Sequence, residues 1–329
     1  MSKRDDARKL PVLISQGEPS GIGPEIALKA LARLRGEIAG HPIHLVGSAG
    51  HFRDAASRLA IVFAQLESHI IDAGPTINPE PGKPSPRNAS SVTLAIERCV
   101  VACMSGKAAA MVTAPIQKST LTEAGFAFPG HTEYLAELTG ARQAVMMLAS
   151  ASVNPPIRVV PLTIHIALKD MFRQLNAEAI VATGRVVLSA LVRDFGIVGP
   201  RLAVAGMNPH AGEDGTMGRE EIEIIAPAIQ TLRKEKHQVI GPLSADSMFH
   251  DDARRRYDAA LCMYHDQALI PIKTLDFWRG VNVTLGLPII RTSPDHGTAL
   301  EIAGKGVANE ASMVAAIEMA TEIADRRGL

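Results

Sequence analysis

A short apolar run that stops at a histidine most constrains what this chain can fold into. Residues 259–264 read Ala-Ala-Leu-Cys-Met-Tyr, and the polar pair His265-Asp266 follows at once. Such a run is typical of a buried strand. Because ligands of open α/β sheets bind at the carboxyl ends of strands, His265 stands where chemistry is expected. Lys273 follows, past Pro271, which we expect to break regular structure.

The same pattern recurs twice. His165 follows the strand-like run 157–163, and His210 follows the run 201–206. Three neutral imidazoles at strand ends are a suitable set for one divalent transition metal, with open positions left for substrate. Each histidine can equally be a buried residue satisfied by hydrogen bonds. The residues alone therefore leave a shared metal site and three structural histidines as alternatives.

Strand-like runs alternate with helical patterns over most of the 329 residues, which predicts the α/β class. Residues 91–104, 177–193 and 311–324 have the clearest helical periodicity. The length suffices for two domains or for one large domain.

Charge and cysteine usage limit the partners. Lys and Arg total 34, as do Asp and Glu, so there is no basic excess to favour nucleic acid or an anionic membrane. No stretch approaches the roughly 20 apolar residues of a membrane span. The three cysteines form neither a CxxC pair nor a disulfide framework, which favours reduced thiols. We therefore expect a cytoplasmic protein with no nucleic-acid or membrane partner.

Two further stretches are candidate anion sites. Residues 17–26 follow a strand-like run and are rich in glycine, so their N–H groups can cradle a phosphate. They match neither G-x-G-x-x-G nor a Walker loop, and a tight turn that needs glycine dihedrals is the equal alternative. His131 precedes a predicted helix whose N-cap we expect at Thr132, where either anion binding or capping alone explains the pattern. Arg291 and Lys273 supply cations suited to phosphate or carboxylate.

Several blocks, taken together and in order, resemble the 4-hydroxythreonine-4-phosphate dehydrogenase family of the vitamin B6 pathway. The strongest blocks are residues 17–26, 130–137, 208–213, 245–249, 264–273 and 276–299. Residues 296–309 are also similar to the cofactor loop of the isocitrate and isopropylmalate dehydrogenases, the wider relatives. The resemblance covers nearly the whole chain.

The resemblance implies an isocitrate/isopropylmalate dehydrogenase-like fold of two α/β domains with an active-site cleft between them. Residues 1–125 with 275–329 would form a discontinuous first domain that carries the cofactor loop. Residues 126–274 would form the second domain, with the metal and dimer contacts.

The resemblance also implies roles for individual residues. One divalent ion, Zn, Mg or Co, would bind a ligand set completed across a homodimer with a shared active site. The candidate proton carriers are Lys273 and Asp246. As departures from the family pattern, Asp214 and Thr216 stand where glycine and histidine are usual. The implied metal ligands are His165, His210 and His265; the implied substrate contacts are His131, Thr132, Lys273, Asn282 and Arg291; and the implied contacts to NAD or NADP are His296, Gly297, Thr298, Ala299 and Asn309.

The implied activity is oxidation of 4-phosphohydroxy-L-threonine by NAD(P), followed by decarboxylation to 3-amino-2-oxopropyl phosphate. Three alternatives stay open. One is a paralogous dehydrogenase for threonate or erythronate 4-phosphate, or for a cyclic diol. The second is a phosphate acyltransferase on a related fold, and the third is a metal-binding protein without catalysis.

Overall fold

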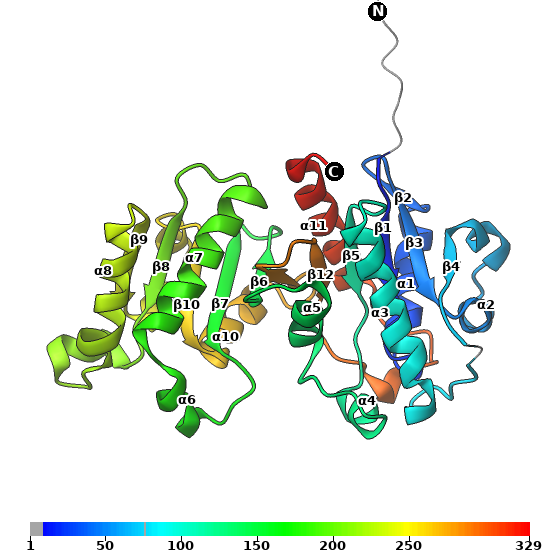
Figure 1. The fold of residues 1–329 in the computed structure, drawn as a ribbon, viewed down its shortest axis with the longest axis horizontal. Coiled ribbons are helices and arrows are strands. Elements are labelled where there is room, and N and C mark those ends of the chain that lie inside the picture. The colour runs from blue at the N-terminus through cyan, green and yellow to red at the C-terminus, as the bar shows by residue number, and fades with distance from the viewer. Residues whose placement is uncertain (1–8, 76) are drawn as a thin grey trace, which may run out of the picture. The chain divides into compact units, whose positions relative to one another are not determined.

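A computed structural model of the chain describes residues 9–75 and 77–329 (Figure 1). They form an α/β protein of two compact units. The first unit ends at Gln143 and resumes at Leu287, and the second unit comprises Ala144–Gly286. The first unit is discontinuous, but both breaks lie further along the chain than the expected breaks after residues 125 and 274.

Two contacts explain the displaced breaks. Helix α5 (His131–Thr139) packs against α3 (Ala89–Met104) and so belongs to the first unit. Strand β11 (Val281–Leu285) pairs antiparallel with β6 (Val145–Ser150) and so belongs to the second unit. The periodicity of the sequence had not singled out residues 281–285 as a strand.

The first unit is built on a mostly parallel sheet. Figure 1 shows α3 in front of this sheet and α1 behind it. All residues of the central strands are buried, as is usual where helices cover both faces. The strand order is β2 (Glu37–Ile38), β3 (His41–Gly47), β1 (Val12–Ser15), β5 (Ala110–Thr113) and β12 (Arg291–Pro294), with β4 (Ile70–Asp72) also paired to β3; the helices besides α3 and α5 are α1 (Gly23–Arg33), α2 (Ala49–Arg58), α4 (Lys118–Glu123) and α11 (Ala311–Arg327).

Strand β12 opens the stretch 291–309, whose glycine-rich and polar composition is typical of a loop. For its first four residues a loop prediction is wrong, because they form a strand that pairs in parallel with β5, with Arg291 opposite Met111. Arg291 is therefore fixed by strand pairing rather than carried on a flexible segment.

The second unit has a mixed sheet with four neighbouring parallel strands. Figure 1 shows α7 in front of this sheet and α10 behind it. The order is β11, β6, β7 (Ile157–Thr163), β10 (Ala259–Tyr264), β8 (Arg201–Ala205) and β9 (Gln238–Leu243); the helices are α6 (Leu168–Gln174), α7 (Ala177–Arg193), α8 (Ala226–Lys234), α9 (Asp251–Arg254) and α10 (His265–Leu275).

Helix α10 begins at His265, directly after β10, and continues through Pro271. The expectation that Pro271 breaks regular structure is wrong. Proline removes one backbone donor from the helix. The apolar side of α10, formed by Ala268, Leu269 and Ile272, is buried in the core against the strands, and this packing stabilises the helix on both sides of the proline.

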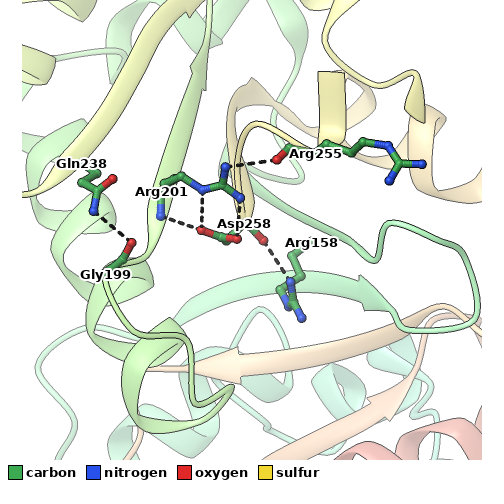
Figure 2. Close-up of polar contacts among 6 residues, drawn as sticks. All are labelled: Arg158, Gly199, Arg201, Gln238, Arg255 and Asp258. Carbon is green, nitrogen blue, oxygen red and sulfur yellow. Dashed lines mark hydrogen bonds and ion pairs between the residues drawn. The ribbon is translucent and has the colours of Figure 1, made fainter. Parts of the chain in front are cut away.

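A polar cluster joins the amino ends of three parallel strands in the second unit (Figure 2). The Asp258 carboxylate accepts hydrogen bonds from the Arg201 backbone N (2.7 Å), Nε (3.2 Å) and Nη2 (3.1 Å). Arg158 Nη1 donates to the carbonyl oxygen of Asp258 at 3.1 Å. Asp258 thereby ties the starts of β7, β8 and β10 together at the end of the sheet opposite to the histidines.

In the described part of the chain, no single helix is long and apolar enough to cross a membrane. Helices α6 and α7 reach that length and composition only when taken together, across a bend of 88°.

Candidate functional site

The three histidines singled out in the sequence lie at one edge of the second unit's sheet. Strands β7, β10 and β8 are parallel neighbours, so their carboxyl ends share an edge. His265 follows β10 directly, and His165 and His210 follow β7 and β8 after short turns. This confirms the predicted placement. His165 and His210 are exposed and His265 is half-buried, so the alternative of three buried core histidines is wrong.

Polar side chains connect these strand ends to one another. Thr163 Oγ1 donates to the Met263 carbonyl oxygen at 2.9 Å, which ties β7 to β10. Gln267 Oε1 accepts from Met263 N at 2.7 Å, and its Nε2 donates to the Gly206 carbonyl oxygen at 2.8 Å. Since Gln267 is buried at the start of α10, it links the segment that carries His265 to the one that carries His210.

His165 and His265 face one cavity. Their ring centroids are 5.8 Å apart. The cavity has a volume of about 360 Å³ and is lined by both histidines, by Thr163 and Tyr264, and by apolar residues of α6 and the preceding loop. Nδ1 of His265 lies 2.7 Å from Asp266 Oδ1. A carboxylate at this position fixes the Nδ1–H tautomer and leaves Nε2 available as a ligand.

His210 lines a second cavity of about 310 Å³, together with Asp246, Asn208 and Gln267. Tyr264 lines both cavities. A hydrogen bond from Ser244 Oγ (2.6 Å) lowers the pKa of Asp246, and the nearby His210 adds to this effect. Asp246 is exposed and ionised at neutral pH, so it can accept a proton, although its low basicity makes it a weak base.

The first unit has a cation-rich site around His131. The pKa of His131 is held well below its usual value, first by burial and then by the positive charges of Arg291 and Lys118. His131 Nε2 is buried and has no hydrogen-bond partner among the described residues. Arg291 is buried as well, and its Nε and Nη2 donate to Thr113 Oγ1 at 3.1 and 2.7 Å. Burial lowers the pKa of Arg291 to about 9, so the guanidinium is still charged at neutral pH.

These features favour an anion beside α5. A neutral imidazole can donate a hydrogen bond to an anion, and a buried guanidinium and the N-terminus of a helix both stabilise negative charge. The helix begins at His131, with Gly130 at the N-cap, so the expected cap at Thr132 is wrong and Thr132 lies in the first turn. No role was predicted for Lys118, although it follows strand β5 in the same way that the histidines follow theirs.

The two remaining substrate candidates lie in the second unit. Lys273 is half-buried on α10, with its Nζ 5.5 Å from the centroid of the Phe277 ring. Asn282 lies on β11, and its Oδ1 is buried without a hydrogen-bond partner in the described part of the chain. A buried amide oxygen of this kind is suited to accept a hydrogen bond from a ligand.

One of the predicted cofactor residues, Thr298, packs on the glycine-rich turn of the first unit. Thr298 is buried, its carbonyl oxygen accepts from Ile22 N at 3.0 Å, and its Oγ1 donates to Gln117 Oε1 at 2.9 Å. A Cβ on Gly21 would lie 2.9 Å from the Thr298 carbonyl oxygen. Close packing therefore requires glycine at position 21. The tight-turn explanation, which needs glycine dihedrals, is supported at Gly17, whose φ is 68°. Ala299 has a left-handed backbone, His296 and Gly297 are exposed, and Asn309 Oδ1 accepts from Ala311 N at 2.9 Å.

The end of this loop is fixed to α1. Glu25 Oε1 accepts from Lys29 Nζ at 2.7 Å and from Ala308 N at 2.9 Å. Lys29 Nζ also donates to the carbonyl oxygens of Gly306 (3.0 Å) and Ala308 (2.8 Å). Glu25 and Lys29 of α1 thus fix the backbone of residues 306–308 by hydrogen bonds.

Comparison with known proteins identifies the family. Residues 33–320 match the family described as "Pyridoxal phosphate biosynthetic protein PdxA". A 4-hydroxythreonine-4-phosphate dehydrogenase of Paracoccus denitrificans is 50% identical over 328 residues, which are 96% of this chain and 98% of that protein. The enzyme of the same name from Caulobacter vibrioides is 49% identical, covering 97% of this chain and 99% of its own length.

The chain belongs to the PdxA family.

A solved structure of another protein with the same name has the same fold. The crystal structure of the Klebsiella pneumoniae 4-hydroxythreonine-4-phosphate dehydrogenase is 37% identical and covers 96% of this chain and 100% of its own, with a TM-score of 0.84. The α/β class is therefore supported both by the elements described above and by a PdxA-type structure.

The donor chemistry at the histidine edge suits the divalent ion that the resemblance to the dehydrogenases implies. The three imidazoles share one edge, and Asp266 orients one of them as a carboxylate commonly orients a metal-bound histidine. Within residues 9–75 and 77–329, however, no three or more His, Cys, Asp or Glu side chains are grouped closely enough to hold a metal. The three PdxA histidines thus fit the ion by chemistry and position, without a preformed three-ligand site in the single chain.

Proposed function

We propose that this protein is a 4-hydroxythreonine-4-phosphate dehydrogenase, which oxidises 4-phosphohydroxy-L-threonine with NAD(P) and decarboxylates the product in pyridoxal phosphate biosynthesis. The observation that carries the proposal is the match to the PdxA family over residues 33–320, with relatives of that activity about 50% identical over nearly the full chain.

The chemistry balances in two steps. Oxidation of the secondary hydroxyl sends a hydride to NAD(P)⁺ and a proton to a base, which leaves a β-keto acid. Loss of carbon dioxide then leaves an enolate, and a proton at the α carbon gives 3-amino-2-oxopropyl phosphate. A divalent ion, when bound, supplies Lewis acidity to the hydroxyl and to the developing enolate. His165, His210 and His265 are the residues that would hold the ion.

The cation-rich site of the first unit supplies the recognition of the phosphate in this proposal. Arg291 is buried, planar and charged, and its contact with Thr113 fixes the orientation of the guanidinium. His131 is neutral, so it can donate a hydrogen bond without adding charge. Thr132 lies in the first turn of α5, where backbone N–H groups are available to an anion. Lys118 adds a second positive charge.

The residues of the second unit act on the reacting carbons. Asn282 would bind the substrate through its buried amide oxygen. Lys273 is the proton carrier that we favour, because an ammonium on α10 can return a proton to the α carbon after decarboxylation. Asp246 stays as the second candidate.

Two further features belong to the proposal through the family resemblance. NAD or NADP would contact His296, Gly297, Thr298, Ala299 and Asn309. A second copy of the chain would complete the metal site, so that the active form is a homodimer. Sedimentation at micromolar concentration would contradict the second feature if it showed a fully active monomer.

The test of the activity is direct. Purified protein is mixed with 4-phosphohydroxy-L-threonine and NAD⁺ or NADP⁺, and both reduced nucleotide and released carbon dioxide are measured. We expect both products in equal amounts, with loss of turnover in a chelator and recovery on addition of Zn, Mg or Co. Threonate 4-phosphate, erythronate 4-phosphate and a cyclic diol are run beside it. Faster turnover of one of these would assign the chain to a paralogous dehydrogenase, and no reduction of nucleotide with any of them would refute the proposal.

A further inference from the structure

The turn that carries His210 has an unusual backbone. His210, Ala211, Glu213 and Asp214 have φ angles of 51°, 53°, 42° and 55°, and Gly212 between them has φ 80°. Five successive residues therefore follow a left-handed path, of which only one is glycine. Side chains clash with the backbone in this conformation, so such residues normally occur singly. The surrounding structure must hold this turn in place.

Glu221 makes the contacts that can do so. It lies at the start of the π-helical turn Glu221–Ile225 and is only 3% exposed. Its Oε1 accepts from Met207 N at 2.6 Å and from Asn208 N at 2.7 Å. Its Oε2 accepts from Asn208 Nδ2 at 2.9 Å. Three N–H donors thus meet one buried carboxylate just before the left-handed turn begins, and charge-assisted hydrogen bonds of this kind are strong.

The glycines around Glu221 show how closely the turn is fitted to this carboxylate. A Cβ on Gly212 would lie 2.6 Å from Glu221 Oε2. A Cβ on Gly206 would lie 2.8 Å from the Cα of Ala211 and 3.2 Å from Glu221 Oε1. On Gly218 it would lie 2.4 Å from Asn208 Nδ2. Glycine at these three positions leaves the space that the carboxylate and the Asn208 amide occupy.

We propose that Glu221 is a positioning residue, whose carboxylate fixes the left-handed turn and thereby sets the place of His210 and the affinity of the site for its divalent ion. This rests on the proposed function only in taking His210 as a metal ligand. Glu221 lies eleven positions from His210 and acts through backbone atoms of Met207 and Asn208.

Replacing Glu221 by glutamine tests the carboxylate with little change in shape. The glutamine oxygen can keep the two backbone donors, but its amide NH₂ then faces Asn208 Nδ2. Asn208 cannot easily turn its amide over, because Nδ2 also donates to Glu220 Oε2 at 2.7 Å. Two donors therefore face each other in Glu221→Gln.

The matched control is Glu223→Gln. Glu223 lies in the same helical turn but is exposed, and it pairs with Arg219 at the surface (2.5 Å). Glu223→Gln removes the same charge and leaves the Glu221 carboxylate with its three N–H donors.

Two measurements are made on the full chain without substrate or nucleotide. In hydrogen exchange of residues 206–218, we expect Glu221→Gln to speed exchange by about 10-fold or more, while Glu223→Gln matches the wild type. In competition with a chromophoric chelator for Zn²⁺ or Co²⁺, we expect Glu221→Gln to lower the affinity by about 10- to 100-fold, which is usual when a residue that orients a ligand is lost. A third measurement adds substrate and nucleotide. At saturating metal, the turnover of Glu221→Gln should return to within about threefold of wild type, because Glu221 touches no reacting atom.

Four outcomes would overturn the inference. Unchanged exchange in Glu221→Gln would show that the carboxylate does not hold the turn. Faster exchange with wild-type metal affinity would show that the conformation of the turn does not affect metal binding. An equal loss of metal affinity in Glu223→Gln would show that the effect comes from the lost negative charge alone. A wild-type chain that binds neither Zn²⁺ nor Co²⁺ would show that the three histidines are not ligands of a divalent ion. A wild type that binds metal but fails to reduce nucleotide would refute the proposed function alone and leave the role of Glu221 standing.

Discussion

Replacing Asp258 by alanine should destabilise the second unit at the end of its sheet that lies away from the histidines (Figure 2). The change removes three hydrogen bonds to Arg201, one of them from a backbone N–H at the start of β8. The Asp258 side chain is 18% exposed and that of Arg201 40% exposed, so solvent weakens the guanidinium part of the pair. Allowing for this, the loss should amount to about 2 kcal/mol, most of it from the backbone hydrogen bond to a charged acceptor.

The assay is native-state hydrogen exchange, read separately for each strand. A loss of about 2 kcal/mol corresponds to about 30-fold faster exchange in β8 and β10. The strands of the first unit serve as an internal control, since the hydrogen bonds of Asp258 within residues 9–75 and 77–329 go to the second unit.

Glu235→Ala is the matched variant. Glu235 binds Arg185 with the same bidentate geometry, accepting from Nε at 3.0 Å and from Nη2 at 2.5 Å. This pair, however, is solvated and includes no backbone donor. We expect no measurable change in exchange for Glu235→Ala. If Asp258→Ala left β8 and β10 unchanged, or if the two variants behaved alike, the reasoning that assigns the stability to the backbone hydrogen bond would be refuted.

Three other predictions follow from the sites. His265→Ala should abolish both metal content and turnover, whereas Arg291→Ala should raise the KM for the phosphorylated substrate and leave metal content unchanged, as mass spectrometry and kinetics can show. Burial lowers the pKa of His51 from 6.5 to about 4, so the unfolded chain binds a proton more readily than the folded chain between these values. Stability should therefore fall as the pH decreases from 6.5 towards 4, and exchange in the first unit of His51→Gln should depend less on pH. Glu25→Gln should loosen residues 306–308 and, if these carry the cofactor as proposed, raise the KM for NAD(P) by about 10-fold; Arg53→Gln, which removes a surface ion pair with Glu67, is the exposed control.

The sequence predicted the elements whose pattern is local. An apolar run followed by a polar pair predicted β10 and the position of His265, and the same pattern predicted the two other strand ends. Helix α7 has the predicted bounds of 177–193. These features depend on residues that are neighbours in the chain, so periodicity is enough to find them.

The features that the sequence did not predict depend on distant residues. Strand β12 exists because β5 lies beside it, and residues 291–294 alone have no strand pattern. Pro271 argued against a helix, and packing of α10 into the core outweighed that local rule. Glu221 was missed and no role was predicted for Lys118, because a glutamate in an acidic run and a lysine after a strand look like ordinary surface residues. Only the contacts to His131 and to the turn that carries His210 distinguish them.

Because the first unit is discontinuous, its sheet can be completed only after the whole second unit has been synthesised. All strands of the second unit come from one continuous stretch, Ala144–Gly286, so their pairing needs nothing that the ribosome has yet to make. Strand β12, which pairs with β5, is translated only after that whole stretch. Until then the edge of β5 that β12 later covers has no paired strand. Arg291 arrives with this last strand. A chain that stops before Leu287 would thus contain every metal ligand candidate and lack Arg291, one of the two cations that we assign to the substrate phosphate. It would also have an open sheet edge that favours aggregation.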